Sequence, residues 1–301
     1  MVDLRFDGRV VVVTGAGQGL GRSHALGFAA RGAKVVVNDA GGRVDGRAEG
    51  AGAGNPASAV AEQIRENGGV AHAHVGDIST EEGAQSLIDA ANEAFGRVDV
   101  VVNNAGILRD KSFKNISAED WDAVIGVHLR GSFLVSRAAF ADLREHGYGR
   151  IINTTSPSGL FGNFGQSNYA AAKMGVVGLT KTLAIEGAKY DINVNAIAPV
   201  AYTRMTEDLF PADAAAKLSP EQVTPLVLWL AHEDCDTTGE VYSVGGGRVA
   251  RVFVAEGPGV VLRDATPEDV HDNWPDINAE RPYVIPRNLA EQTEVHFRDL
   301  L

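Results

Sequence analysis

The sequence predicts an α/β protein built on a doubly wound parallel sheet of about seven strands, followed by a C-terminal extension. Three observations predict it: short β-branched runs recur, longer amphipathic stretches separate them, and a glycine-rich turn follows the first run. Apolar strands alternating with helices indicate a parallel sheet covered by helices on both faces. The 301 residues, of which 45% are hydrophobic, suffice for one large core.

Strands and helices are expected to alternate along the chain. We predict strands at 10–13, 34–38, 70–75, 98–102, 150–155, 192–197 and 240–244. Helices are predicted at 20–30, 57–66 and 81–95, from 118 onward, at 168–189 and at 221–231. Ser117, Ser219 and Thr266 each precede an acid or Gln three residues later, which is typical of a helix N-cap.

The regular alternation divides the chain into a core at 1–247 and an extension at 248–301. Segment 41–56 holds six glycines and little apolar material, so we expect a mobile loop inserted after the second strand. The extension is rich in proline, with possible strands at 249–254 and 260–262.

The excess of acidic over basic residues limits the classes of partner that the protein is expected to bind. The chain has 27 Lys and Arg against 39 Asp and Glu, a net charge of −12. Nucleic acids and anionic membranes are bound by the opposite balance, so we expect neither as a partner. Cys235 is the single cysteine, which leaves no internal disulfide. The N-terminus shows no signal-peptide pattern, the C-terminus shows no peroxisomal tripeptide, and the apolar runs are short, so we expect a cytoplasmic protein.

The turn from Thr14 to Gly21 follows the first strand and opens a helix. Its glycines have the spacing G-x-x-x-G-x-G, from Gly15 through Gly19 to Gly21. Glycines there allow a tight turn, and the free amides at a helix start favour a pyrophosphate. A plain strand-to-helix turn is the alternative interpretation.

Asp39 ends the second predicted strand, 24 residues after Gly15 (39 − 15). This spacing is near that of the acid that binds the adenosine ribose in Rossmann-type folds. A carboxylate accepts hydrogen bonds from both ribose hydroxyls and repels a 2′-phosphate, and Gln18 places no cation in the loop. We therefore predict NAD rather than NADP as the cofactor; a solvated acid is the alternative.

Tyr169 and Lys173 stand four residues apart, on one face of a predicted helix. An adjacent ammonium is expected to lower the pKa of a tyrosine and fit it for acid–base catalysis. Ser156 ends the fifth predicted strand, where ligands of doubly wound sheets gather, so it is placed to bind a substrate oxygen.

The segments 14–21 and 103–106, with Ser156 and the Tyr169–Lys173 pair, together resemble the short-chain dehydrogenase/reductase family. The resemblance implies that Ser156, Tyr169, Lys173 and His128 are catalytic. His128 stands near the family's usual helix Asn, whose backbone carbonyl supports a water in the proton relay; for its side chain, a satisfied core histidine is the favoured interpretation. The residues implied to hold NAD are Gly15, Gln18, Gly19, Leu20, Gly21, Asp39, Asp77, Ile78, Asn104, Ala105, Gly106, Tyr169, Lys173, Pro199 and Thr203.

Segments 4–10, 103–110, 127–133 and 162–166, with the glycine-rich insertion, narrow the resemblance. They are similar to the (3R)-hydroxyacyl-CoA dehydrogenase units of type 2 multifunctional enzymes of fatty acid metabolism. This implies NAD-dependent oxidation of a (3R)-hydroxyacyl-CoA, a homodimer, and an extension that covers the acyl pocket.

Several alternatives remain open. The substrate is alternatively a hydroxysteroid or another secondary alcohol. An NADP-dependent ketoacyl-carrier reductase and a non-catalytic dinucleotide sensor are less favoured, because of Asp39 and the intact catalytic residues. Arg109, Lys111 and Lys114 are candidates for binding coenzyme A phosphates, or plain surface cations. His72 and His74 share a strand face without a third ligand, so we expect no metal site.

Overall fold

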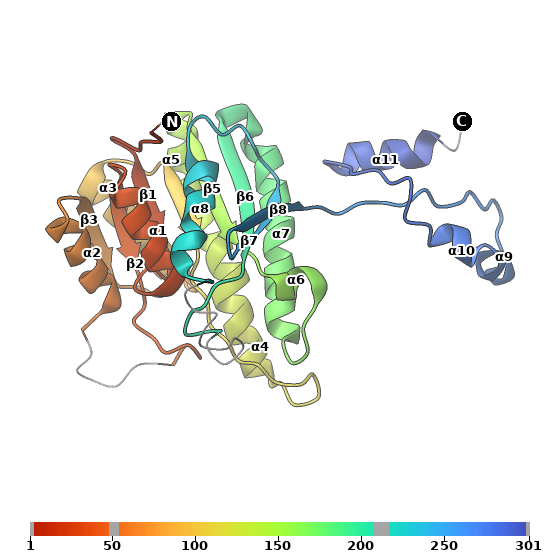
Figure 1. The fold of residues 1–301 in the computed structure, drawn as a ribbon, viewed down its shortest axis with the longest axis horizontal. Helices are drawn as coiled ribbons and strands as arrows, with labels where there is room; N and C mark the ends of the chain where they lie inside the picture. Colours follow the sequence, from red (N-terminus) through yellow and green to blue (C-terminus); the bar gives the residue numbers. More distant parts are fainter. Residues whose placement is uncertain (1–2, 48–53, 207–216, 299–301) are drawn as a thin grey trace. The chain divides into compact units, whose positions relative to one another are not determined.

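The computed structural model describes residues 3–47, 54–206 and 217–298, and divides into two compact units, 1–251 and 252–301. The first unit contains one sheet in the order β3-β2-β1-β4-β5-β6-β7-β8 (Figure 1). Its strands are β1 Val10–Val13, β2 Lys34–Asn38, β3 Val70–His74, β4 Val100–Asn103, β5 Gly149–Thr154, β6 Ile192–Pro199, β7 Val241–Gly245 and β8 Arg248–Val252. Neighbouring strands from β3 to β7 pair in parallel.

The predicted doubly wound fold is confirmed, with eight strands instead of about seven. The extra strand is β8, which the two-residue Gly246–Gly247 turn joins to β7. A two-residue connection requires an antiparallel pair, so β8 closes the edge as a hairpin. Of the two strands suggested in the extension, the first corresponds to β8, whereas 260–262 has no strand.

Two apolar layers cover the two faces of the sheet. One includes α1 Gly19–Ala29, α2 Pro56–Glu66 and α8 Thr224–Ala231; the other includes α3 Glu81–Phe95, α5 Gly131–His146 and α7 Ser167–Gly187. The central strands are buried along their whole length because both faces lie under helices. Shorter elements are α4 Ala118–Ile125, α6 Pro157–Phe161 and the 3-10 turns Ala188–Tyr190 and Pro220–Gln222.

The long helix predicted from residue 118 is interrupted. Its α-helical first part ends at Ile125, and a π-helical turn spans Gly126–Arg130 before α5 begins. The predicted cap Ser117 accepts a hydrogen bond from the backbone of Asp120. Ser219 is the N-cap residue of the 3-10 turn Pro220–Gln222, as predicted, but its side chain makes no capping hydrogen bond in the described part of the chain.

The second unit contains three short helices: α9 Pro267–Asp272, α10 Trp274–Ile277 and α11 Leu289–Arg298. Thr266 forms the predicted cap of α9, with Asp269 completing a capping box. Among the described residues, no helix is long and apolar enough to span a membrane.

Candidate active site

The carboxyl ends of the parallel strands border a cavity of about 940 Å³. Strands β1, β2, β4, β5 and β6 all end at its wall, as expected for a doubly wound sheet. Every residue predicted to be catalytic or to bind the cofactor lines this cavity, apart from Gly21. The fold therefore brings together side chains that are up to 188 residues apart in the sequence (203 − 15).

The glycines of the first turn are required for different reasons. A Cβ on Gly15, which has φ +61°, would stand 2.7 Å from Cα of Ala105. A Cβ on Gly21 would overlap the carbonyl oxygen of Gly15, so Gly21 packs α1 against the turn and does not face the cavity. Gly19 has φ +54°, and the nearest atom to its Cβ would be Cγ2 of Thr203 at 3.6 Å. Only Gly15 and Gly19 of these three line the cavity.

The start of α1 can hold an anion. Its cap residue Gln18 makes no side-chain capping bond in the described part of the chain, and the first turn carries no acid. The first amides of the helix are then available to a ligand, and the helix dipole favours negative charge there. Gly19 and Leu20 line the cavity at this point, so the geometry fits a pyrophosphate.

Asp39 is fixed at the end of β2. Its Oδ2 accepts from the backbone N–H of Gly17 at 3.0 Å, and its Oδ1 accepts from that of Gly41 at 2.8 Å. Asp77 and Ile78 form the next part of the wall, where Asp77 Oδ1 accepts from the N–H of Ser79 at 2.9 Å. A carboxylate held at this place suits ribose hydroxyls and disfavours an added phosphate.

Asn104 connects the ends of β1 and β4. Its Nδ2 donates to the carbonyl oxygens of Thr14 and Gly15, both at 3.0 Å. In return, Thr14 Oγ1 accepts from the backbone N–H groups of Asn104 and Ala105 at 3.0 and 3.1 Å. These bonds hold the glycine turn against β4, and Thr14 is a positioning residue that the sequence analysis did not single out.

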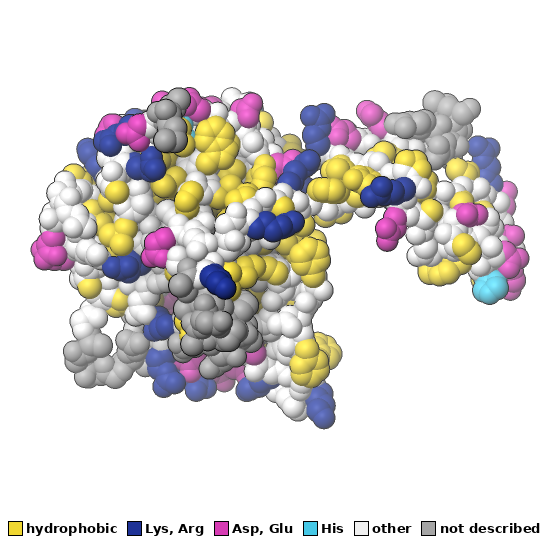
Figure 2. All heavy atoms as spheres, in the orientation of Figure 1, with side chains coloured by type: hydrophobic (Ala, Val, Ile, Leu, Met, Phe, Trp, Pro, Cys, Tyr) yellow, Lys and Arg dark blue, Asp and Glu magenta, His cyan; other side chains and the backbone are white. Residues whose placement is uncertain are grey.

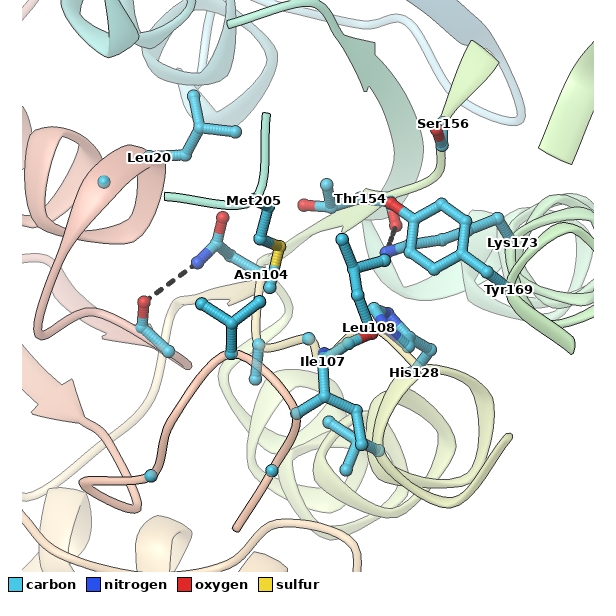
Figure 3. A pocket seen from close by; sticks show the side chains of 18 of the residues that line it. Leu20, Asn104, Ile107, Leu108, His128, Thr154, Ser156, Tyr169, Lys173 and Met205 are labelled. Atoms are coloured by element: carbon cyan, nitrogen blue, oxygen red, sulfur yellow. Dashed lines mark hydrogen bonds between the residues drawn. The ribbon is translucent and has the colours of Figure 1, made fainter. Parts of the chain in front are cut away.

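Tyr169 and Lys173 both face the cavity from α7 (Figure 3). Lys173 is 3% exposed, its Nζ donates to the carbonyl oxygen of Thr154 at 2.6 Å, and it lies 5.6 Å from the Tyr169 ring centroid. Burial lowers the pKa of Lys173 to about 7. Thr155 Oγ1 donates to the backbone oxygen of Lys173 at 2.7 Å, which anchors this turn of α7 to the end of β5.

The expected lowering of the tyrosine pKa is wrong. Loss of solvent raises the pKa of Tyr169, a hydrogen bond with Ser156 opposes the rise, and the charge of Asp110 adds to it. Residue spacing shows that two groups are neighbours, but it does not show how much water their surroundings exclude. Ser156 also caps α6, where its Oγ accepts from the N–H of Ser158 at 3.2 Å.

His128 lies in the π-helical turn, 2% exposed, with its ring edge-on to Tyr169 at a centroid distance of 5.0 Å. Its Nε2 lies 3.1 Å from the backbone nitrogen and 2.8 Å from the backbone oxygen of Ile107. Nδ1 is buried without a partner in the described part of the chain, so the prediction of a satisfied core histidine holds for one ring nitrogen only. Burial holds the pKa of His128 well below its usual range, and the charge of Lys173 adds to this. The backbone carbonyl accepts from Ser132 Oγ at 2.7 Å.

The cations suggested for coenzyme A differ in their surroundings. Arg109 is 14% exposed and lies 3.6 and 3.5 Å from the carboxylates of Glu119 and Asp120. Lys111 donates to Asp120 at 2.7 Å, and Lys114 is exposed. Arg109 and Lys111 therefore already form ion pairs with carboxylates of the protein itself.

His72 and His74 both belong to strand β3. His74 lies 3.0 Å from Nδ2 of Asn38 and 3.1 Å from Oγ of Ser86. Among the described residues, no group of three or more His, Cys, Asp or Glu is arranged to hold a metal ion.

Residues 9–214 match the family model described as short chain dehydrogenase. The chain belongs to the short-chain dehydrogenase family. It is 50% identical over 300 residues to the peroxisomal multifunctional enzyme type 2 of Mus musculus, covering 97% of this chain and 40% of that enzyme. It is 43% identical over 260 residues to a hydroxyacyl-CoA dehydrogenase of Mycobacterium tuberculosis, covering 81% of this chain and 80% of that protein.

A solved structure supports the same assignment. The full-length peroxisomal multifunctional enzyme type 2 of Drosophila melanogaster has a TM-score of 0.83 and 38% identity, over 99% of this chain and 50% of that one. The chain thus spans 40% of the mouse enzyme and 50% of the Drosophila enzyme. As a short-chain dehydrogenase it is an oxidoreductase, and the resemblance predicted from Tyr169, Lys173, Ser156 and the glycine turn is confirmed. The cytoplasmic location stays a prediction, since the mouse relative is named as peroxisomal.

Proposed function

We propose that this short-chain dehydrogenase oxidises a (3R)-hydroxyacyl-CoA to the 3-ketoacyl-CoA with NAD, using Tyr169 as the acid–base. The observation that carries the proposal is the convergence of Ser156, Tyr169 and Lys173 on the cavity that the glycine turn and Asp39 also border. The hydroxyacyl-CoA dehydrogenase among the relatives supports the substrate class. Asp39 supports NAD over NADP, because a carboxylate at the end of β2 accepts hydrogen bonds from ribose hydroxyls and repels a 2′-phosphate.

The residues present fit NAD: an uncapped helix start for the pyrophosphate, Asp39 for the ribose, and Asp77 with Ile78 for the adenine. When bound, NAD supplies the ring that accepts hydride from the carbinol carbon. The Ser156 hydroxyl orients the substrate oxygen, and Tyr169 in its phenolate form accepts the hydroxyl proton. The C–H hydrogen leaves with its electron pair as hydride, and the electron pair of the broken O–H bond forms the second bond between oxygen and carbon.

Lys173 assists the proton transfer from one helical turn away. Its amino group is held by Thr154 and has a pKa of about 7, so it can exchange a proton near neutral pH. The raised pKa of Tyr169 makes the phenolate scarce at neutral pH, so the oxidative reaction is limited by loss of the phenol proton. Activity in the oxidative direction is therefore expected to rise with pH.

The test follows NADH formation with (3R)- and (3S)-hydroxyacyl-CoA and with a hydroxysteroid. We expect activity with the (3R) thioester, and a roughly 10²–10⁴-fold loss of kcat in Tyr169→Phe. Tyr190→Phe, in the 3-10 turn that follows α7 and outside the cavity lining, is the matched control and should keep its rate. Activity confined to the (3S) thioester or to the steroid would reject the substrate assignment, and full activity of Tyr169→Phe would reject the mechanism.

A further inference from the structure

The start of the glycine-rich insertion forms a tight turn that is fixed to the loop after β4. The N–H of Arg43 donates to the oxygen of Arg47 at 2.8 Å, closing the turn. The N–H of Leu108 donates to the oxygen of Val44 at 2.9 Å, and Arg109 Nε donates to the oxygen of Asp45 at 2.9 Å. Residues 43–47 of the insertion are therefore held by hydrogen bonds to the loop after β4, and they border the main cavity.

Arginines surround a single carboxylate on this turn. Asp45 lies 3.8 Å from Arg43 Nε and 3.6 Å from Arg47 Nη1, distances too long for good hydrogen bonds. The side chains of Arg43 and Arg47 are 65% and 70% exposed, so these ion pairs are weak and readily exchanged for a stronger anion. Arg109 is largely covered and holds the turn in place.

A second cavity of about 320 Å³ lies against this turn and shares a wall with the main one. Arg43, Val44, Asp45, Leu108 and Arg204 line it, and all of these except Asp45 also line the main cavity. Two exposed arginines from distant segments, Arg43 of the insertion and Arg204 of the loop after β6, thus line both the second cavity and the active-site cavity. In Figure 2, Lys and Arg side chains alternate with Asp and Glu side chains along the lower edge of the core unit, where α4 and the insertion lie in Figure 1.

We propose that Arg43, Arg47 and Arg204 form a phosphate-binding site for the nucleotide end of the substrate, while Arg109 positions the turn that carries the first two. The proposal rests on the proposed function, since a coenzyme A thioester carries its phosphates far from the reacting carbon. They must then bind at the opening of the cavity and not beside Tyr169. Guanidinium groups suit this role because they bind phosphate oxygens bidentately. In a chain of net charge −12, a local cluster of arginines is needed to hold such a substrate.

The 2′-phosphate of NADP is a second possible source of the same chemistry, because Arg43 follows Asp39 by four residues. Asp39 is the residue assigned to the ribose, and its carboxylate disfavours a phosphate there. We therefore assign the arginines to the substrate, and the experiment separates the two sources.

The test compares a (3R)-hydroxyacyl-CoA with the matching pantetheine thioester, which lacks the nucleotide phosphates. In the double variant Arg43→Ala, Arg47→Ala we expect KM for the CoA thioester to rise about tenfold or more, with kcat unchanged. KM for the pantetheine thioester and KM for NAD should not change. The matched control is Arg65→Ala on α2, an exposed arginine that pairs with Glu62 outside the cavity.

A second measurement does not depend on the thioester reaction. Adenosine 3′,5′-bisphosphate is titrated into the protein saturated with NAD, and the double variant should bind it about tenfold more weakly. Equal binding by wild type and variant, or an equal loss with both thioesters, would overturn the proposal. A selective loss of affinity for NADP would assign the arginines to the cofactor instead. Arginine-dependent binding of the bisphosphate without oxidation of any acyl-CoA would leave the phosphate site standing and reject the proposed function.

Discussion

Replacing Lys173 by Met should stabilise the protein at neutral pH while removing its activity. The pKa of Lys173 is about 7 instead of 10.5. At about 1.4 kcal/mol per pKa unit, keeping this buried amine protonated costs about 5 kcal/mol of unfolding free energy below pH 7. Met fills a similar volume without a charge. It leaves the carbonyl of Thr154 unpaired, which costs about 1–3 kcal/mol.

The sign of this effect depends on pH. Between the folded pKa of about 7 and the unfolded value of 10.5, the unfolded chain binds more protons at Lys173, so wild-type stability rises with pH. The variant lacks this slope. We expect it to be more stable than wild type by roughly 2–4 kcal/mol below about pH 7, and less stable by roughly 0–2 kcal/mol near pH 10.

Urea unfolding at several pH values measures the difference. Lys181→Met, on the same helix and outside the cavity lining, is the control and should change stability by no more than about 0.5 kcal/mol. If Lys173→Met were equally destabilised at both ends of the pH range, the buried ammonium would not be the cause of the slope, and its role as a tuned group would fail.

Three further predictions concern the cofactor site and the buried histidines. Asp39→Ser should raise KM for NAD and lower KM for NADP; an unchanged ratio of kcat/KM for the two would contradict the ribose assignment. Gly21→Ala should lower the free energy of unfolding by more than about 2 kcal/mol, because its methyl group overlaps the carbonyl of Gly15. Gly178→Ala, where the added methyl group meets open space, should raise it by about 0.5–1 kcal/mol. Urea unfolding of the two variants measures the difference. Burial lowers the pKa of His24 to about 3 and that of His128 well below 6.5. The NMR ring signals of both histidines should therefore not titrate between about pH 7 and about pH 5. The free energy of unfolding should fall as the pH drops below about 6.5, because only the unfolded chain gains these protons.

The structure differs from the sequence-based predictions where a helix is interrupted and where local contacts decide the role of a residue. Periodicity predicted one long helix from residue 118, but the π-helical turn at Gly126–Arg130 changes which side chains face inward. His128 therefore contacts Ile107 and Tyr169. Gly21 was assigned to the cofactor because it belongs to the motif, yet its tight contact is with the backbone of Gly15. At both His128 and Gly21, the contact that decides the role of the residue is made with atoms whose positions the local sequence pattern does not predict.

The sequence by itself determined the order of strands and helices, the family, and the position of the glycine turn, Asp39, Ser156, Tyr169 and Lys173 at strand ends or on one helix face. These follow from short-range periodicity and contiguous motifs, which each segment carries alone. Only the tertiary structure decided the direction of the Tyr169 pKa, the pairing of Lys173 with Thr154, and the meeting of Arg43 with Arg204. Those depend on excluded water and on contacts between distant segments, which arise when the sheet assembles.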